Sequence, residues 1–327
     1  MGFAEIIGQQ KALDPLRAAL AQGRLHHAYL FHGPEGVGKR TIGLALAQAI
    51  HCDQMADDFC GHCVNCLRIK SGNHPDVRLI EPTAGKKEIS IQQIRSIEKE
   101  LSFRAFSGKK IAIIDPATLM NLPAQNALLK TLEEPPPDSL LILVASNAGG
   151  LLPTVRSRCL RIAFGPLPRE LIAGYLAAKQ TMTQDDARLV AAMSMGSLGA
   201  ALDLDREELV EQRRNWIETM RSLKPGNYQT VLNAAEALSG SREESLKFLA
   251  WMETWYRDLL IYCVTREARE LINLDMVKTI QQQSAAGNPE RILEALSQAA
   301  GAAARIQRNL NRRMILEELF MAAAEAR

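Results

Sequence analysis

The sequence predicts an α/β fold, with a parallel sheet covered by helices on both faces, followed by domains built only of helices. Short apolar segments typical of strands alternate with helical segments as far as about residue 165, and the pattern is helical after that point. The strand segments are almost continuously apolar, as expected for strands buried on both faces of a parallel sheet. A glycine-rich loop separates the first strand from the next helix, which is the context of a phosphate-binding loop.

The first predicted domain covers residues 1–165. Its expected helices cover residues 9–22, 39–50, 90–101 and 119–132. Its expected strands cover residues 28–32, 77–80, 110–114, 140–145 and 160–163. A cysteine-rich segment at about 51–70 directly follows the second helix, and we interpret it as a module inserted into this domain.

Two helical domains are expected to follow. Short helices at 169–179 and 184–195 predict a small lid subdomain over residues 166–207. Residues 208–327 predict a larger helical domain with a break near Lys224-Pro225-Gly226.

For the aromatic and basic residues of the last domain, a structural role is favoured over direct contact with nucleic acid. Trp251, Trp255 and Tyr256 lie at helical spacing, which favours the core or a subunit interface over base stacking. A final helical stretch is expected over 292–323. Its arginines at 305, 308, 312 and 313 predict a basic stripe, typical of a solvated face, with contact to a partner or DNA as the alternative.

Length and composition limit the classes of protein. A chain of 327 residues is too long for one compact core, so several domains are expected. A net charge of +2 with 39 Lys and Arg is too balanced to indicate general nucleic-acid binding. The N-terminus lacks the pattern of a secretion signal, and no segment has the roughly 18 to 20 apolar residues that span a bilayer. We therefore expect a cytoplasmic protein with no membrane contact.

The glycine-rich loop GPEGVGK at residues 33–39 matches the first seven positions of the phosphate-binding P-loop. Its backbone amides and the following helix N-terminus suit a phosphate, and Lys39 adds a full positive charge. The eighth position, where a Ser or Thr hydroxyl binds magnesium, is Arg40. Thr41 comes one residue late and is rotated about 100° away. Magnesium coordination is therefore in doubt.

A second acidic element follows the strand at 110–114. Asp115 ends this strand as the acid of a Walker B segment does, and the next residue is Pro116. Proline cannot act as the general base that activates water in ATP hydrolysis. We expect no hydrolysis, while ATP binding and a loop with no ligand both stay open. The candidate nucleotide-binding residues are Gly33, Gly36, Gly38, Lys39 and Asp115.

Two segments resemble the subunits of bacterial clamp loaders, which belong to the AAA+ class. The segment NALLKTLEEPP at 126–136 is similar to their long helix and its Leu-Glu-Glu-Pro-Pro turn, and Ser157-Arg158-Cys159 resembles their Ser-Arg-Cys motif. The resemblance covers residues 3–205 well. The helical remainder is similar in length and character to the collar domain through which these subunits assemble. The resemblance therefore implies an AAA+ P-loop domain, a helical lid and a collar.

Departures from the family pattern favour its non-hydrolysing subunit type over its gamma/tau-type motors. The Gly-Ser-Leu sequence of the lid is followed by Gly199, where motors carry a nucleotide-sensing arginine. In the family, the arginine of Ser-Arg-Cys reaches into the ATP site of the adjacent motor. Arg158 is therefore the candidate catalytic residue, as an arginine finger acting in trans. Local pairing of Arg158 is the alternative, and Arg156 is a second candidate.

The resemblance also implies partners. They are gamma/tau ATPase subunits and a delta subunit in a heteropentamer of the DNA polymerase III holoenzyme, with the sliding clamp and primer-template DNA reached through the assembled complex. No autonomous catalysis is expected. An active gamma/tau-type ATPase and a free-standing DNA-binding zinc protein are the competing hypotheses.

The cysteine cluster is the other candidate site. Cys52, Cys60, Cys63 and Cys66 are separated by seven, two and two residues. Four thiolates at such spacing suit a tetrahedral structural Zn²⁺ with no open position. An iron–sulfur cluster is the alternative, and His51 or His62 could replace one ligand. Cys159 and Cys263 are expected to be buried small residues.

Overall fold

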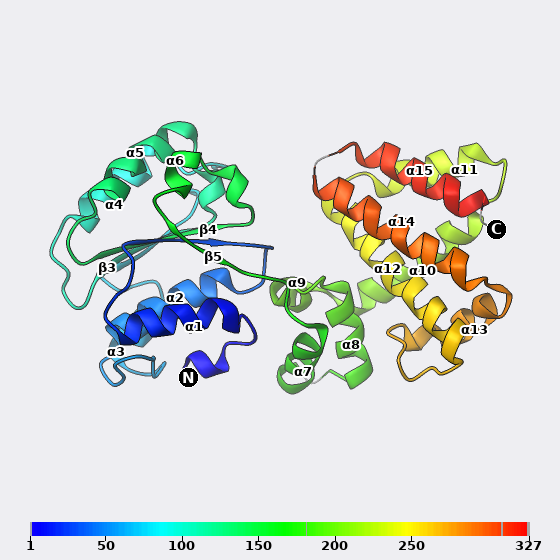
Figure 1. Cartoon of the computed structure of the whole chain (residues 1–327), viewed down its shortest axis with the longest axis horizontal. Helices are drawn as coiled ribbons and strands as arrows, with labels where there is room; N and C mark the ends of the chain where they lie inside the picture. Colours follow the sequence, from blue (N-terminus) through cyan, green and yellow to red (C-terminus); the bar gives the residue numbers. More distant parts are fainter. Residues whose placement is uncertain (1, 181, 309, 326–327) are drawn as a thin grey trace. The chain divides into compact units, whose positions relative to one another are not determined.

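The computed structural model describes residues 2–180, 182–308 and 310–325. The chain forms two compact units (Figure 1). The first comprises Met1–Leu171 together with Ser197–Gly199, and the second comprises Ile172–Gly196 and Ala200–Arg327. The first unit is the α/β part of the chain and the second is helical.

The α/β unit contains one five-stranded parallel sheet, which confirms the predicted fold class. The strand order is β2-β3-β4-β1-β5. The strands are β1 (Ala28–His32), β2 (Val77–Ile80), β3 (Lys110–Ile114), β4 (Ser139–Ala145) and β5 (Leu160–Ala163). β1 lies between β4 and β5, and β3 lies between β2 and β4, all in parallel register. The loops at the carboxyl ends of these strands therefore share one edge of the sheet.

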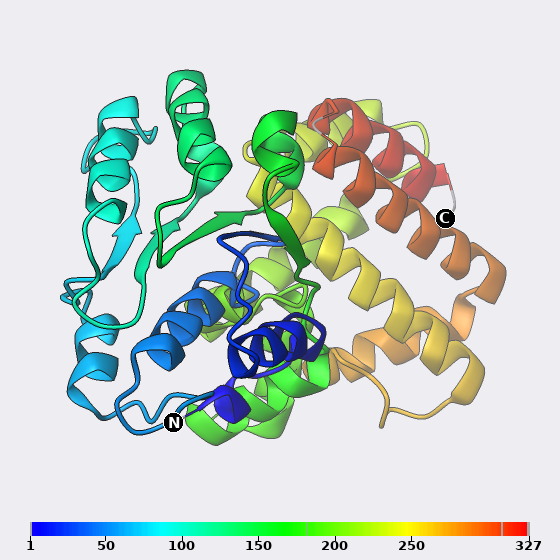
Figure 2. The ribbon, with the colours of Figure 1, turned by 60° about the vertical axis from the view of Figure 1, so that its left-hand side comes forward.

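Helices cover both faces of the sheet, as Figures 1 and 2 show. Successive side chains of a strand point to opposite faces. Phe31 and Ile113 accordingly belong to one buried cluster and Leu30 and Ile114 to the other. One cluster includes residues of α1 (Gln10–Ala21), α2 (Lys39–His51) and α3 (Val64–Lys70). The other includes residues of α4 (Ile91–Leu101), α5 (Leu122–Glu133) and α6 (Pro153–Arg156).

Caps explain where the helices of the sheet domain begin. Ser90 and Gln93 form a reciprocal capping box at the start of α4, close to the predicted boundary. The helix expected at 119–132 starts later, at Leu122. Asn121 accepts a hydrogen bond from the amide of Ala124 at 3.0 Å and so fixes the start of α5. A short 3₁₀ turn, η2 (Ala117–Leu119), occupies the preceding residues, and others lie at η1 (Phe3–Glu5) and η3 (Ala148–Gly150).

The later part of the chain is helical. Its helices are α7 (Arg169–Lys179), α8 (Gln184–Met193), α9 (Leu198–Asp203), α10 (Arg206–Ser222), α11 (Tyr228–Leu238), α12 (Arg242–Thr265), α13 (Val277–Ala286), α14 (Pro289–Gln307) and α15 (Arg312–Glu325), with a 3₁₀ turn η4 at Leu274–Met276. The gap between α10 and α11 falls at the predicted Lys224–Gly226 break. The boundary between lid and collar near residue 207 stays a prediction.

The core of the helical unit is aromatic. Trp251 and Trp255 are buried, in agreement with their interpretation as core residues, while Tyr256 is half-buried. Phe248 and Trp251 pack with centroids 5.7 Å apart, and Phe248 also meets Phe320 edge-on at 5.5 Å. Such pairs add stability beyond the area that they bury. The two tryptophans are therefore enclosed in the core rather than exposed for base stacking.

The expectation of one helical stretch over 292–323 was wrong, because α14 ends at Gln307 and α15 begins at Arg312. The Asn311 side chain accepts a hydrogen bond from the amide of Met314 at 3.3 Å, which starts a new helix. The predicted basic stripe is divided by this break, and three of its four arginines contact groups of the same chain. Arg305 pairs with Glu318 at 2.7 Å and Arg313 with Glu317 at 2.9 Å. Arg312 donates to the Ser239 carbonyl.

A buried polar network fastens one end of the helical unit. Arg213 is fully buried, and its guanidinium donates to both carboxylate oxygens of Asp275 and to Asn273. Asp258, also fully buried, accepts from the amide and the side chain of Asn273. A buried charge is tolerated when it is paired and hydrogen-bonded in this way.

Among the described residues, no helix combines the length and apolarity that a membrane span needs.

Candidate functional site

The P-loop connects β1 to α2 at the carboxyl edge of the sheet. Gly33, Gly36 and Gly38 all have positive φ values, of 143°, 68° and 100°. At Gly33 a Cβ atom would lie 2.1 Å from the carbonyl oxygen of Phe164, so a side chain there would collide with the backbone. The sequence motif thus forms the expected glycine loop between a strand and a helix.

Lys39, the P-loop lysine, bonds to its own loop. Its side chain is buried, with a residue exposure of 6%, and Nζ donates to the carbonyl oxygen of Gly33 at 2.7 Å and to that of Pro34. Burial lowers the pKa of Lys39, and the charges of Asp115 and Glu35 offset part of that shift. The ammonium group therefore stabilises the loop in the absence of a phosphate.

Arg40 extends from the eighth position of the motif to two carboxylates. Its Nε donates to Asp115 at 2.5 Å, and one terminal nitrogen pairs with Glu81. Asp115, the Walker B acid, is largely enclosed, with 14% of its side chain exposed. The acid that would bind magnesium in an active site is therefore already paired with a cation of the same chain.

Glu81 was not predicted as a site residue, although its position in the sequence indicates one. Glu81 directly follows β2 in the same way that Asp115 directly follows β3. Residues that follow neighbouring parallel strands meet at one edge of the sheet. An acid after each of two consecutive apolar strands was thus a usable clue.

The segment Ser197–Gly199 also belongs to the α/β unit, and it contacts the P-loop. The amide of Gly199 donates to the carbonyl oxygen of Gly36 at 2.9 Å. A Cβ atom at Gly199 would lie 3.0 Å from the Cα atom of Gly36. This close approach suits glycine and leaves little space for a larger side chain.

The four predicted cysteine ligands come together at the other end of α2. Cys52 follows the last residue of α2, and Cys63 caps α3, which contains Cys66. All four sulfur atoms lie within 4.8 Å of one another. Bonds of about 2.3 Å to one tetrahedral ion place sulfurs about 3.8 Å apart, so the group suits a single metal ion.

Backbone amides support these sulfurs. The amide of Cys63 donates to Cys60 Sγ at 3.2 Å, and the amide of Cys66 donates to Cys63 Sγ at 3.4 Å. Gly61 has a φ of 74°, which permits the tight turn between Cys60 and Cys63. Burial raises the pKa of Cys66 to about 12, so a thiolate there requires a neighbouring cation. The donor set therefore fits a metal ion.

Neither neighbouring histidine is part of the four-cysteine group. His62 Nδ1 lies 2.8 Å from the Cys60 carbonyl oxygen. His51 Nδ1 lies 3.2 Å from Ser107 Oγ, and its ring lies against His74 at 4.5 Å. An all-cysteine group agrees with the predicted ligands. Cys159 is buried as expected, whereas Cys263 is only half-buried.

Asp76 organises a second polar cluster beside this module, which the sequence did not reveal. Its buried carboxylate accepts from the amides of Phe106 and Ser107 and pairs with Lys110 at 2.8 Å. Burial alone would raise the pKa of Asp76, but the ammonium of Lys110 and the two amides lower it. His51 and His74 lie close enough to Asp76 to form a possible metal-binding group. Because Lys110 and two amides already bind the carboxylate, we interpret Asp76 as structural.

Arg158 lies between α6 and β5. Its guanidinium pairs with Glu133, the last residue of α5, at 2.6 Å and donates to the Thr154 carbonyl oxygen at 3.0 Å. About a third of its side chain is exposed, at 35%. Both partners come from α5 and α6, whereas the P-loop leads into α2 on the other face of the sheet. The local contacts thus turn Arg158 away from the chain's own P-loop.

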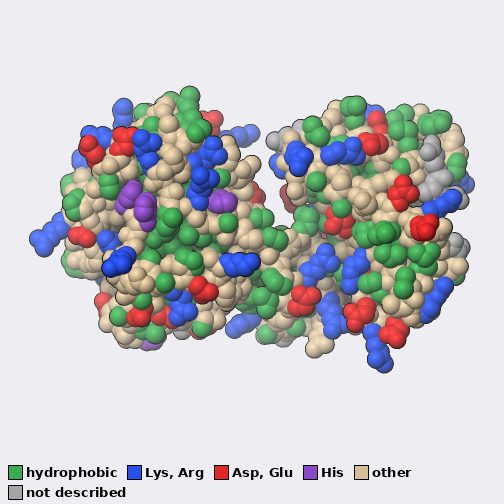
Figure 3. Space-filling model, in the orientation of Figure 1, with side chains coloured by type: hydrophobic (Ala, Val, Ile, Leu, Met, Phe, Trp, Pro, Cys, Tyr) green, Lys and Arg blue, Asp and Glu red, His purple; other side chains and the backbone are tan. Residues whose placement is uncertain are grey.

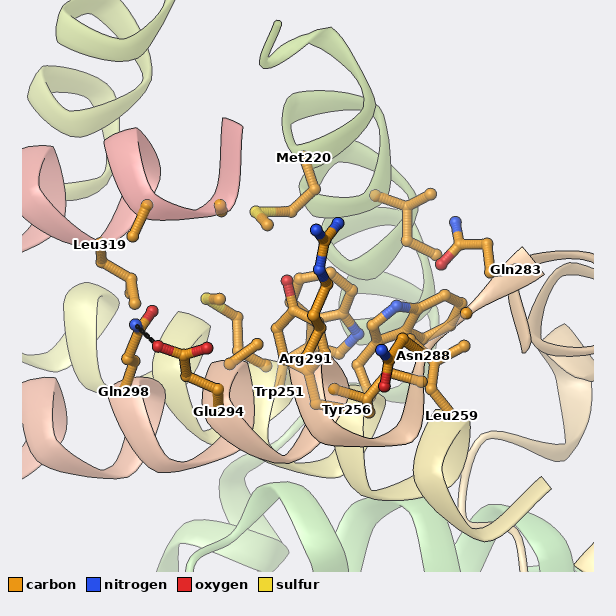
Figure 4. A pocket seen from close by; sticks show the side chains of 18 of the residues that line it. Met220, Trp251, Tyr256, Leu259, Gln283, Asn288, Arg291, Glu294, Gln298 and Leu319 are labelled. Atoms are coloured by element: carbon orange, nitrogen blue, oxygen red, sulfur yellow. Dashed lines mark hydrogen bonds between the residues drawn. The ribbon is translucent and has the colours of Figure 1, made fainter. Parts of the chain in front are cut away.

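A cavity of about 750 Å³ opens in the helical unit (Figure 4). Its lining is mostly aliphatic and aromatic, with Trp251, Tyr256 and Leu259 among its residues, and it also contains polar residues such as Arg291 and Glu294. Trp251 Nε1 has no hydrogen-bond partner among the described residues. The lining offers no arrangement of nucleophile and base, so it adds no catalytic site.

Charged side chains of both signs are mixed on the face drawn in Figure 3. Figure 3 shows Lys and Arg interspersed with Asp and Glu on the visible face of each unit. This agrees with the near-neutral composition.

The sheet, the P-loop with its paired acid, and the helical domains that follow define an AAA+-like protein of the clamp-loader class. A family model described as the delta subunit of DNA polymerase III matches residues 8–168. A second model, described as the C terminal part of the delta subunit, matches residues 207–324. The chain is 30% identical to DNA polymerase III subunit delta' of Bacillus subtilis, over 97% of this chain and 96% of that protein. It is 31% identical to subunit delta' of Pseudomonas aeruginosa, over 98% and 97%.

The chain therefore belongs to the family of delta' subunits of the DNA polymerase III clamp loader. It is also related to the tau subunit of that polymerase. Subunit tau of Bacillus subtilis is 28% identical over 80% of this chain and half of its own length.

Proposed function

We propose that this delta'-family subunit is a stator of the clamp loader that does not hydrolyse ATP. The observation that carries the proposal is the pairing of Asp115 with Arg40 directly before Pro116. Hydrolysis needs a metal held by the Walker acid and a base that positions water. Here the acid binds an arginine, and proline stands at the position of the base.

Arg158 is the residue that we assign to catalysis in the neighbouring subunit. Its position on the outer α5–α6 side and its partial exposure support a role in trans. The ion pair with Glu133 is between exposed groups, so it is weak enough to be exchanged for a phosphate. An arginine so placed would stabilise charge on the γ-phosphate of an adjacent motor. Arg156 stays a weaker candidate, and its Nε is buried without a hydrogen-bond partner among the described residues.

The partners follow from this role. We propose that the chain assembles through its helical collar with gamma/tau-type ATPase subunits and a delta subunit in a heteropentamer. The assembled complex would open the sliding clamp and place it on primer-template DNA in the cytoplasm. The relationship to a tau subunit supports assembly of related chains into one ring.

We propose that Cys52, Cys60, Cys63 and Cys66 hold a structural Zn²⁺. Four cysteine sulfurs form a closed shell with no position for a reacting water, so the metal would fix the segment between α2 and α3. Metal analysis of protein prepared without chelator should find about one zinc per chain. A chain containing iron and inorganic sulfide instead would contradict this assignment.

The purified chain provides the test of the stator proposal. Alone it should show no ATP turnover above the background of a mock preparation, and mixed with tau and delta subunits it should elute in one complex. Robust turnover by the chain alone, abolished by Lys39→Ala, would identify an active gamma/tau-type ATPase instead. Tight, strongly salt-dependent DNA binding by the isolated chain would favour a free-standing DNA-binding protein.

A further inference from the structure

Two carboxylates meet at the edge of the sheet beside the P-loop. Glu81 follows β2 and Asp115 follows β3, and these strands pair in parallel with Ile80 opposite Ile114. The amide of Asp115 donates to the Ile80 carbonyl oxygen at 3.0 Å, which fixes the two acids side by side. Carboxylate oxygens are preferred Mg²⁺ ligands, so this edge has the ligand type of a magnesium site.

The group between these acids is the guanidinium of Arg40. It bonds to both carboxylates, through Nε and one terminal nitrogen. An arginine is always charged, and its planar fork can bind two acceptors at once. Burial alone would lower the pKa of Arg40, but Asp115 and Glu81 outweigh that effect and raise it. Both acids are therefore paired with a cation that cannot dissociate from the protein, and the three groups together carry a net charge of −1.

The P-loop itself is also held by groups of this chain. Lys39 Nζ binds the carbonyl oxygens of Gly33 and Pro34, and the amide of Gly199 binds that of Gly36. These contacts and the Arg40 pairs reach the loop from different parts of the unit. The loop is thus held by polar contacts within this chain.

We propose that Arg40 is a resident cation that takes the place of magnesium at this P-loop and makes the site unresponsive to Mg²⁺. Any adenine nucleotide that the loop accepts is bound equally with and without the metal. The inference concerns the chain's own P-loop. It does not depend on the role of Arg158 in a neighbouring site.

The test is calorimetric titration of the full chain with ADP, in millimolar Mg²⁺ and in Mg²⁺-free buffer. No chelator is added, because a chelator would also attack the cysteine site. For the wild-type chain, the ADP affinity should change by less than about twofold between the two buffers. Arg40→Ser frees both acids and supplies a hydroxyl, so it should bind ADP at least about tenfold more tightly with Mg²⁺.

Two further variants separate charge from damage to the loop. Arg40→Lys keeps a cation beside the acids and should stay unresponsive to Mg²⁺. Arg95→Ser removes an exposed arginine of α4 and should behave as the wild type. If the wild type binds no ADP in either buffer, Arg40→Ser must still gain Mg²⁺-dependent binding.

Three results would overturn the inference. They are a tenfold Mg²⁺ response of the wild type, no Mg²⁺ response of a folded Arg40→Ser chain, and a response of Arg40→Lys equal to that of Arg40→Ser. A tenfold Mg²⁺ response of the wild type would overturn the inference even if every variant failed to fold. None of these titrations measures ATP hydrolysis in the loader, so their failure is distinct from failure of the stator proposal.

Discussion

Helix α2 has a candidate ligand site at each end, and the two differ in what their residues already bind. At its start, Lys39 and Arg40 are bonded to carbonyl groups and carboxylates of the same chain. Just past its end, Cys52 joins three other cysteines, and their four sulfurs lie within 4.8 Å of one another. The first site satisfies its own polar groups, and the second calls for a metal ion.

We propose that the glycine loop is kept for its shape and the cysteine cluster for its ligands. The glycine loop matches a nucleotide-binding pattern in seven positions, and Lys39 holds it through bonds to its own carbonyl groups. The cysteine cluster brings together the four sulfurs that a tetrahedral metal ion needs. The predictions below test whether the two ends depend on ligands as differently as their contacts indicate.

The largest effect is expected at the cysteine end. Cys66→Ser removes a fully buried ligand, so the chain should lose its bound metal and unfold more easily, by on the order of 5 kcal/mol. Metal content and denaturant unfolding measure the two effects. Cys159→Ser changes a buried cysteine outside the cluster and should retain the metal. Full metal content in Cys66→Ser would remove the basis for the contrast between the two ends.

A smaller loss is expected at Asp76, which supports the structure around His51 at the end of α2. Asp76→Asn removes the charge of a fully buried carboxylate that pairs with Lys110, and it should cost about 3 kcal/mol of unfolding free energy. The control is Asp138→Asn, because Asp138 is exposed and its ion pair with Lys109 spans 3.5 Å. That control should stay within about 0.5 kcal/mol of the wild type.

Acid should reduce the difference between the wild type and Asp76→Asn. The folded-state pKa of Asp76 is lowered, so its contribution is complete above the unfolded-state pKa of about 3.9 and is lost as pH falls through the folded value. Urea unfolding at a series of pH values should show the two chains converging below about pH 4. A constant difference down to the most acid condition would argue against a charged Asp76.

The smallest effect is expected at the P-loop lysine. Lys39→Ala removes two hydrogen bonds to loop carbonyls and should cost only about 1–2 kcal/mol of stability. The ATPase rate of a reconstituted loader that contains this variant should change by less than about twofold, because the account assigns hydrolysis to other subunits. A collapse of the rate would mean that this P-loop takes part in turnover.

Sequence patterns predicted the features that depend on residues close together in the chain. The strands agree because they are short, mostly apolar segments between polar residues, although the edge strands β2 and β5 each contain an arginine. The four cysteines come together because they lie within 15 positions. The break between α14 and α15 was missed because the apolar pattern continues across the cap at Asn311. Glu81 was missed although it follows a strand as Asp115 does, because its place beside Asp115 depends on the pairing of β2 with β3. Gly199 was missed because its contact with Gly36 joins residues far apart in the chain.

The outcome of the Arg40 site also shows a limit of motif comparison. The sequence shows that Arg40 replaces a magnesium ligand, but not where its guanidinium points. The structure adds that it binds the Walker acid itself. Loss of the Ser or Thr hydroxyl would only remove one magnesium ligand. The Arg40 side chain also pairs with Asp115 and so neutralises the charge of that acid.

The central claim is that this subunit supplies an arginine to a neighbour and hydrolyses no ATP itself. The direct measurement is the DNA-stimulated ATPase of a loader reconstituted with Arg158→Ala, alongside Arg158→Lys and the Arg156→Ala control, after gel filtration has shown normal assembly. The account predicts that, in this assay, the rate of ATP hydrolysis at the motor site next to Arg158 falls by about a thousandfold or more in Arg158→Ala. Arg156→Ala should keep the wild-type rate. An unchanged rate in a correctly assembled Arg158→Ala complex would contradict the account.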